Sequence, residues 1–230
     1  MKRFIGGIAV VALALGLLAD AASAQLTGNP VYAINPGVGV TLNADFGRGL
    51  NDDSGKDQVF AGRVVLGVPT VSFWVGGGLW DSRIEGADKE VTLAGGAAIN
   101  LIKAPLLPVA LTLQAGAGRV SCGTDCSTLT AILGPSLKIN VPVPAIGVEP
   151  WIMPRVQLTR GSLGGVSDTD FGIGASAGVN VKLPAGPGFH LAVDWSRSGD
   201  PSTEPIVAGI GVHYSIKVPS LGVPLVPVVN

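Results

Sequence analysis

Two histidines and one aspartate are the residues of this sequence best suited to acid–base chemistry. His190 and Asp194 lie four residues apart in one alternating stretch, and His213 lies in the next. Residues of the same parity in a strand point to the same side, so the sequence places these three on one face of neighbouring strands. A His–Asp pair there could move protons, or it could belong to a polar network that compensates buried charge. We expect the network, because interior cations also need partners.

A serine-hydrolase pattern, Gly-x-Ser-x-Gly, occurs around Ser176, between Gly174 and Gly178. That chemistry needs a sharp strand-to-helix turn which exposes the serine. Here the pattern lies inside the most regular alternating stretch, so we interpret its glycines as structural. We therefore expect no enzyme, no catalytic residue and no cofactor.

Metal binding is also weakly indicated. Oxygen-rich acidic loops can hold hard cations, but this chain has only short acidic pairs such as Asp52-Asp53 and Asp168-Thr-Asp170. We interpret these carboxylates as solvated loop charge, and the sequence predicts no metal site.

Composition limits the class of protein. The 230 residues are 47% hydrophobic and only 13% charged, whereas soluble domains carry roughly 25% charged residues. This excludes intrinsic disorder, which requires low hydrophobicity and high charge. The net charge of −1 argues against a nucleic-acid partner. Beyond the N-terminus, no apolar run is long enough for a spanning helix. With 34 Gly and 17 Pro, an all-β chain is expected.

The first 24 residues have the features of a secretory signal peptide. Lys2 and Arg3 precede an apolar stretch at residues 4–19, and small residues at 22–24 form a cleavage site before Gln25. The alternative is an uncleaved anchor. In an exported chain the only two cysteines, Cys122 and Cys126, indicate one small disulfide, and no nearby histidine supports a metal site instead.

The rest of the chain alternates apolar with small or polar residues, which is typical of strands with two different environments. Ten such stretches occur, most of them close to the 9–11 residues that a tilted strand needs to cross a bilayer. They cover residues 38–46, 58–67, 70–80, 91–101, 109–118, 129–141, 148–159, 171–183, 189–196 and 206–217. Pro135, Pro150 and Pro154 predict irregular pairing in the sixth and seventh.

The connections between these stretches alternate in character. Those after even-numbered stretches are short and Pro-rich, and those after odd-numbered stretches are polar and mostly longer, such as residues 47–57, 81–90 and 160–170. An up-and-down sheet places the two kinds at opposite ends. Short turns at one end and polar loops at the other are typical of outer-membrane barrels.

The alternation gives the predicted sheet an apolar face and a polar face, and the polar face has few charged residues. A small soluble barrel also alternates, but ten water-facing strands should carry many more charged residues. We therefore assign the polar face to a lumen, whose largest residues, Trp74, Trp80, Trp151 and Arg155, should partly plug it. The other lumen-lining candidates are Asp45, Arg63, Lys138, Glu149, Lys182, His190, Asp194 and His213. Aromatic residues of the apolar face predict two girdles at the membrane surfaces: Phe46, Phe60, Phe73, Phe171, Phe189, Trp195 and Tyr214.

With a terminal segment Gly209-Ile-Gly-Val-His-Tyr214, the chain resembles the small outer-membrane β-barrels of Gram-negative bacteria, the group that includes OmpA-like and OmpW-like proteins. Members usually end near an aromatic residue, whereas here a Pro/Val-rich tail follows at residues 218–230. The resemblance implies an antiparallel barrel of about ten strands, with eight possible, over residues 25–217. It implies contact with outer-membrane lipid and lipopolysaccharide, and either a structural and surface role or a narrow porin-like passage for small solutes. A soluble periplasmic ligand-binding barrel, or less plausibly a small hydrolase, is the alternative. The sequence does not predict the oligomeric state.

Overall fold

A computed structural model of the chain describes residues 26–34, 37–83, 88–103, 108–121, 125–184, 186–199 and 202–216. The expected signal peptide at 1–24 and the tail at 218–230 lie outside these residues, so both stay predictions. Within the described part, no helix is long and apolar enough to cross a membrane.

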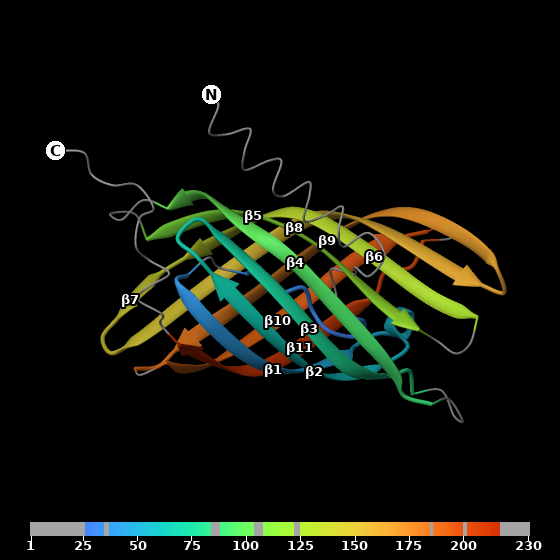
Figure 1. Ribbon diagram of the computed structural model, residues 1–230, viewed down its shortest axis with the longest axis horizontal. Coiled ribbons are helices and arrows are strands. Elements are labelled where there is room, and N and C mark those ends of the chain that lie inside the picture. Colours follow the sequence, from blue (N-terminus) through green and yellow to red (C-terminus); the bar gives the residue numbers. More distant parts are fainter. Residues whose placement is uncertain are drawn as a thin grey trace.

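The chain forms a closed antiparallel barrel (Figure 1). Consecutive strands pair along the whole sheet, β1 pairs with β11, and β6 pairs with β8 to close the circle. Ten strands make the wall. The short β7 follows β6 and pairs with the start of β8 as a hairpin, and a 3-10 turn, η1 (Asp52–Ser54), lies between β1 and β2. The strands are β1 (Gly39–Gly49), β2 (Gln58–Gly67), β3 (Val71–Asp81), β4 (Glu90–Lys103), β5 (Val109–Ser121), β6 (Cys126–Ile139), β7 (Val141–Val143), β8 (Ile146–Leu163), β9 (Val166–Lys182), β10 (Pro187–Ser198) and β11 (Ile206–Ile216). The expected ten-stranded, all-β barrel is confirmed.

Each predicted stretch corresponds to one wall strand, but one predicted loop is wrong. Instead of a polar loop at 160–170, β8 and β9 continue to a two-residue turn at Gly164 and Gly165. Both glycines have positive φ, 59° and 83°, as a tight hairpin turn matched to the strand twist requires. Polar composition alone misled the prediction, because a strand that projects beyond the apolar belt has polar residues on both faces.

The prolines of β6 and β8 interrupt the wall. These strands pair at Leu133–Val156 and again at Leu137–Ile152, with the pairing broken between. The register places Pro135 opposite Pro154, and neither can donate a backbone hydrogen bond. The gap is thus a local consequence of two facing prolines in an otherwise continuous ladder.

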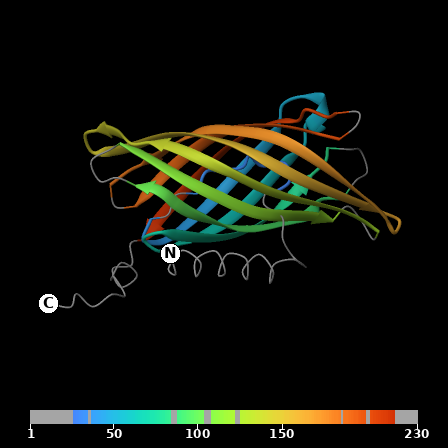
Figure 2. The same cartoon turned by 90° about the horizontal axis from the view of Figure 1, so that it is seen from above.

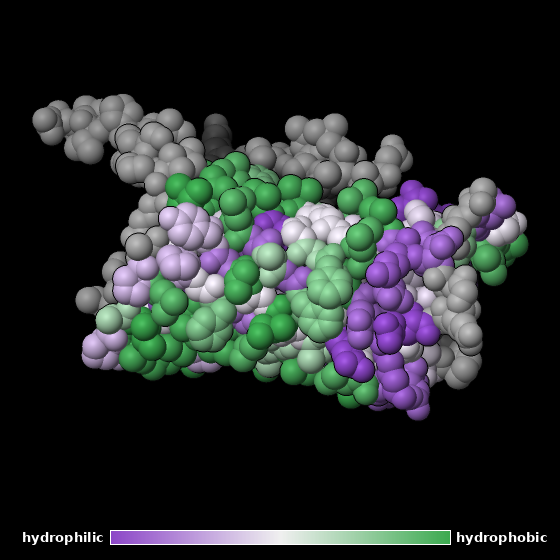
Figure 3. All heavy atoms as spheres, turned by 90° about the horizontal axis from the view of Figure 1, so that it is seen from below, coloured by the Kyte–Doolittle hydropathy of each residue, from purple (hydrophilic) through white to green (hydrophobic). Residues whose placement is uncertain are grey.

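Polarity is inverted relative to a soluble barrel. Among the described residues, 33 large apolar side chains are exposed, whereas 18 buried residues are polar or charged. Figure 3 shows apolar residues over the side of the barrel and hydrophilic ones gathered at one end. A closed barrel leaves no unpaired edge in lipid, so this surface fits a bilayer. The distribution excludes the soluble periplasmic alternative, which needs its apolar face inside.

A segment that belongs to no strand occupies the interior. Residues 26–34, here called the lumen segment, have no regular secondary structure and are almost all buried. In Figures 1 and 2 the blue trace of this segment runs inside the barrel. It makes a turn in which Asn29 N–H donates to the Leu26 carbonyl at 2.9 Å, and it leads into β1.

Candidate functional site: the barrel lumen

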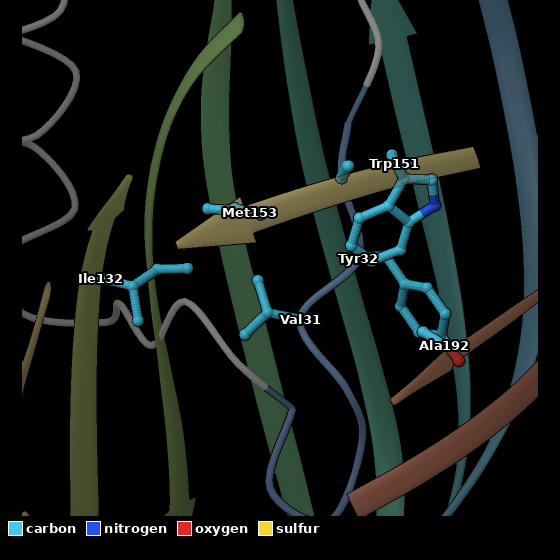
Figure 4. Packing of buried hydrophobic residues seen from close by; sticks show 7 residues of the cluster. Val31, Tyr32, Ile132, Trp151, Met153 and Ala192 are labelled. Carbon is cyan, nitrogen blue, oxygen red and sulfur yellow. The ribbon is translucent and has the colours of Figure 1, made fainter. Parts of the chain in front are cut away.

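The lumen segment packs against the barrel wall in two apolar clusters. In one, Val31 and Tyr32 contact Ile132 of β6, Met153 of β8 and their neighbours (Figure 4). In the other, Leu26 and Ile34 pack with Trp74, Ala94 and Ala98 of β3 and β4. Because each cluster combines the segment with wall residues, the apolar packing inside the barrel includes the segment.

Glycines of the wall make room for the segment. A Cβ at Gly47 would lie 2.2 Å from the Gly28 carbonyl oxygen, and one at Gly209 would lie 2.4 Å from the Tyr32 hydroxyl. Real Cβ atoms do not approach other atoms so closely. The two strands that carry these glycines, β1 and β11, are hydrogen-bonded neighbours. They form a smooth part of the wall on which the segment backbone lies.

Hydrogen bonds hold the segment backbone. The Gln114 side chain accepts from Ile34 N–H at 2.8 Å and donates to the Tyr32 carbonyl at 3.0 Å. Nearer the loops, Thr27 N–H donates to Thr92 Oγ1 at 3.2 Å. Such bonds replace water for a backbone that has no strand partner.

One ion pair connects the wall to the segment. Arg155 of β8 donates two hydrogen bonds to Asp194 of β10, at 2.9 and 2.8 Å. Asp194 also accepts from Ser176 Oγ at 2.5 Å and from Val31 N–H at 3.2 Å. Both charged side chains are at most 2% exposed, so each depends on the other for compensation.

A second group lies around Tyr32. Arg63 donates to Asp45 at 2.5 and 3.1 Å, and its guanidinium lies 4.3 Å from the centre of the Tyr32 ring. His190 Nε2 lies 2.7 Å from Asp45 Oδ1, and its Nδ1 lies 3.3 Å from His213 Nδ1. A cavity of about 90 Å³ borders this group.

The third charged group lies toward the short turns. Glu149 accepts from Lys138 at 3.0 Å and from Lys182 at 2.8 Å. Lys138 is buried, whereas the Lys182 side chain is 46% exposed. All seven charged lumen candidates of the sequence analysis therefore belong to three ion-paired groups.

Among the described residues, the serine of the Gly-x-Ser-x-Gly pattern belongs to a charged network in the lumen. Ser176 lies inside β9, and its hydrogen-bonding partners are Arg155 and Asp194, with no histidine among them. The sequence left open whether a histidine pairs with Asp194 or belongs to a polar network, and His190 lies beside Asp45 rather than Asp194. The sequence could not distinguish these partners, since both aspartates occupy inward positions.

The remaining predicted residues are placed as follows. Trp74 and Trp151 are buried in the interior, and Trp80 donates to Asp57 at 2.5 Å near the loops. Five of the girdle candidates are exposed by 40% or more, namely Phe60, Phe73, Phe171, Phe189 and Tyr214, while Phe46 and Trp195 are partly buried. Cys126 is not a free cysteine, but Cys122 lies outside the described residues, and the disulfide stays a prediction.

No pattern in the sequence led us to expect the lumen segment. Tryptophans and Arg155 were expected to obstruct the lumen; Trp74, Trp151 and Arg155 are buried, and the chain itself also enters the interior. A signal was present: the apolar run from Pro30 to Ile34 lies between the cleavage site and the first strand, where an exposed linker would be polar.

No protein-family model matches the chain, and no curated protein matches it. Comparison with solved structures finds β-barrels. The N-terminal β-barrel domain of Pseudomonas aeruginosa OprF is 13% identical, covers 79% of this chain and 100% of its own, and has a TM-score of 0.40. The outer membrane protease OmpT of Escherichia coli is 11% identical, with 78% and 94% covered and a TM-score of 0.38. Ail, the attachment invasion locus protein of Yersinia pestis, is 9% identical, with 77% and 97% covered and a TM-score of 0.31.

The ten-stranded antiparallel wall has the architecture that the sequence predicts. The closed wall, apolar belt and polar lumen are features of this chain itself. Together they are the features of a membrane-spanning barrel of the outer-membrane type.

Proposed function

We propose that this protein is an outer-membrane barrel that is closed to solutes at rest and serves a structural and surface role. The observation that carries the proposal is the lumen segment, which fills the interior between two apolar clusters. A ten-stranded wall is intermediate between small barrels filled by side chains and porins of about sixteen strands with an aqueous channel. We expect a wall of this size, filled with backbone over residues 26–34, to leave too little room for solutes to pass.

The partners of a closed barrel are those which its surfaces contact. Its apolar belt would contact lipid chains, and its polar loops would contact lipopolysaccharide or other molecules outside the cell.

A gated narrow pore is the second candidate function. It is favoured by one specific observation: the segment is not part of the sheet, and side chains such as Gln114 and Asp194 hold it. Its departure would leave the wall hydrogen bonds intact, so the barrel could open without unfolding.

Single-channel recording in planar bilayers tests both ideas. We expect the native protein to show no steady conductance. We expect Gly47→Ala and Gly209→Ala to conduct, because the added methyl groups collide with the segment. Gly62→Ala is the matched control, since a Cβ there meets nothing closer than 3.8 Å. Heat-dependent migration on a denaturing gel verifies that each variant folds.

The outcomes separate the roles. Steady conductance by the native protein contradicts a closed barrel. Folded glycine variants that stay silent would support the structural role and exclude gating by this segment.

A further inference from the structure

A second cavity lies at the loop end of the lumen, separate from the small cavity beside Tyr32. Its volume is about 310 Å³, near the lower limit of small-molecule sites. The turn Thr27–Gly28 forms one side, and residues from η1, β3, β6, β8, β10 and β11 form the others. Nothing in the proposed function uses this cavity, and its role does not depend on whether the lumen conducts.

The charged residues that line the cavity are acidic. Asp53, Asp57 and Asp194 line it, and no lysine, arginine or histidine of the described part of the chain does. Asp194 is neutralised by Arg155. Among the described residues, the other two carboxylates have hydrogen-bond donors that are neutral: Asp53 accepts from Glu204 N–H at 2.7 Å, and Asp57 accepts from the Trp80 indole at 2.5 Å. The cavity thus has a net negative charge, which repels anions.

A buried acceptor provides an independent indication of a ligand. Gln157 is only 5% exposed and lines the cavity, and its Oε1 has no hydrogen-bond partner among the described residues. A buried acceptor left without a donor costs about 1–3 kcal/mol. Seven of the fifteen lining residues are serine or threonine, whose hydroxyls can also accept hydrogen bonds. The site is therefore rich in acceptors for a ligand that brings donors.

We propose that this loop-end cavity binds a small organic cation with two or more N–H donors, such as a linear diamine. Its ammonium groups would compensate Asp53 and Asp57 and donate to Gln157, and the Trp80 ring offers an aromatic surface of the kind that attracts organic cations. A metal ion fits less well, because within the described ranges no three metal-binding side chains are close enough to hold one. Burial raises the pKa of Asp57 above its usual value, so a bound cation would also relieve the cost of this carboxylate.

Isothermal titration of the folded full-length mature barrel in detergent tests the proposal, with putrescine as the probe. We expect saturable binding that Asp57→Asn, Asp53→Asn and Gln157→Leu each weaken by about tenfold or more, as the loss of a charge-assisted or buried hydrogen bond implies. Asp168→Asn is the matched control, because it removes one carboxylate from an exposed site at the same end of the barrel outside the cavity. This control should bind putrescine as the native protein does.

Parallel titrations with calcium chloride and glucose identify the class of ligand. Binding of calcium or glucose in preference to putrescine would overturn the proposal, as would absence of putrescine binding. Equal weakening by Asp168→Asn would overturn it too, since binding would then reflect the general charge of the loops. Variants that lack heat-dependent migration are replaced by Asp57→Ser or Gln157→Met and judged by the same criteria.

Discussion

Removing Asp194 should be among the most destabilising single changes in this barrel. In Asp194→Ala, the Arg155 guanidinium, whose side chain is fully buried, loses its counter-charge. Breaking a buried pair in this way costs about 3–5 kcal/mol. Val31 N–H and Ser176 also lose an acceptor, which adds about 1–3 kcal/mol for a donor left unsatisfied. The summed loss of unfolding free energy approaches the lower end of the range for whole proteins, which is about 5–15 kcal/mol.

The matched double variant Arg155→Met/Asp194→Leu should recover most of the loss. Replacing a buried ion pair by apolar residues of similar volume is often neutral or stabilising. Asp168→Ala, at an exposed loop position, should stay within about 0.5 kcal/mol of the native protein.

Urea unfolding of the barrel in lipid vesicles, followed by tryptophan fluorescence, measures these differences. A loss below about 1 kcal/mol for Asp194→Ala would mean that water screens the pair as it does at a surface. The reasoning from a dry, filled lumen would then be refuted. If Arg155→Met/Asp194→Leu is as unstable as Asp194→Ala, the ion pair must specify the geometry of the lumen in addition to compensating its charge.

Three further changes probe the belt, the loops and the disulfide. Leu191→Arg, on the outer face of β10, should destabilise insertion into vesicles by about 2–4 kcal/mol if the site lies near the bilayer midplane; the same change at the exposed Ser202 should have little effect. Burial raises the pKa of Asp57 above its usual value of 3.8, so folding favours the protonated carboxyl. The contribution of Asp57 to the free energy of unfolding is therefore fully present below pH 3.8 and is lost as pH rises through the raised pKa. Urea unfolding between about pH 3 and about pH 7 should therefore show a smaller decline of the unfolding free energy in Asp57→Asn than in the native protein. Identical slopes of unfolding free energy against pH would contradict the burial of this carboxylate. Cys126→Ser should cost no more than about 2 kcal/mol, because the predicted bridge closes a very short loop. Peptide mapping without reductant checks that the bridge exists, and two free thiols would contradict it.

The regular geometry of β-strands explains how much of the fold could be predicted. Alternation is a local property: at residues 171–182, apolar residues alternate with glycine and polar residues, and side chains of a strand point to opposite faces. The positions of the ten strands and the two environments of the wall therefore follow from the sequence. The length of β8 and β9 does not, because outside the membrane the alternation fades while the pairing continues.

The partners of the lumen residues depend on the tertiary structure. Arg63 and Asp45 lie on neighbouring strands, but His190 reaches Asp45 from 145 residues away. Which inward residues meet is decided by the tilt and stagger with which the strands close the circle. Neither quantity is encoded in the alternation of a single strand.

By itself, the sequence determined that this is a chain of short strands with an apolar and a polar face, and it predicted a signal peptide before them. Only the tertiary structure decided what fills the lumen. Residues 26–34 have no periodicity because they form no regular element, and their burial depends on space left by Gly47 and Gly209 on distant strands. An irregular segment is placed by the shape of its surroundings, which exists only after the barrel has closed.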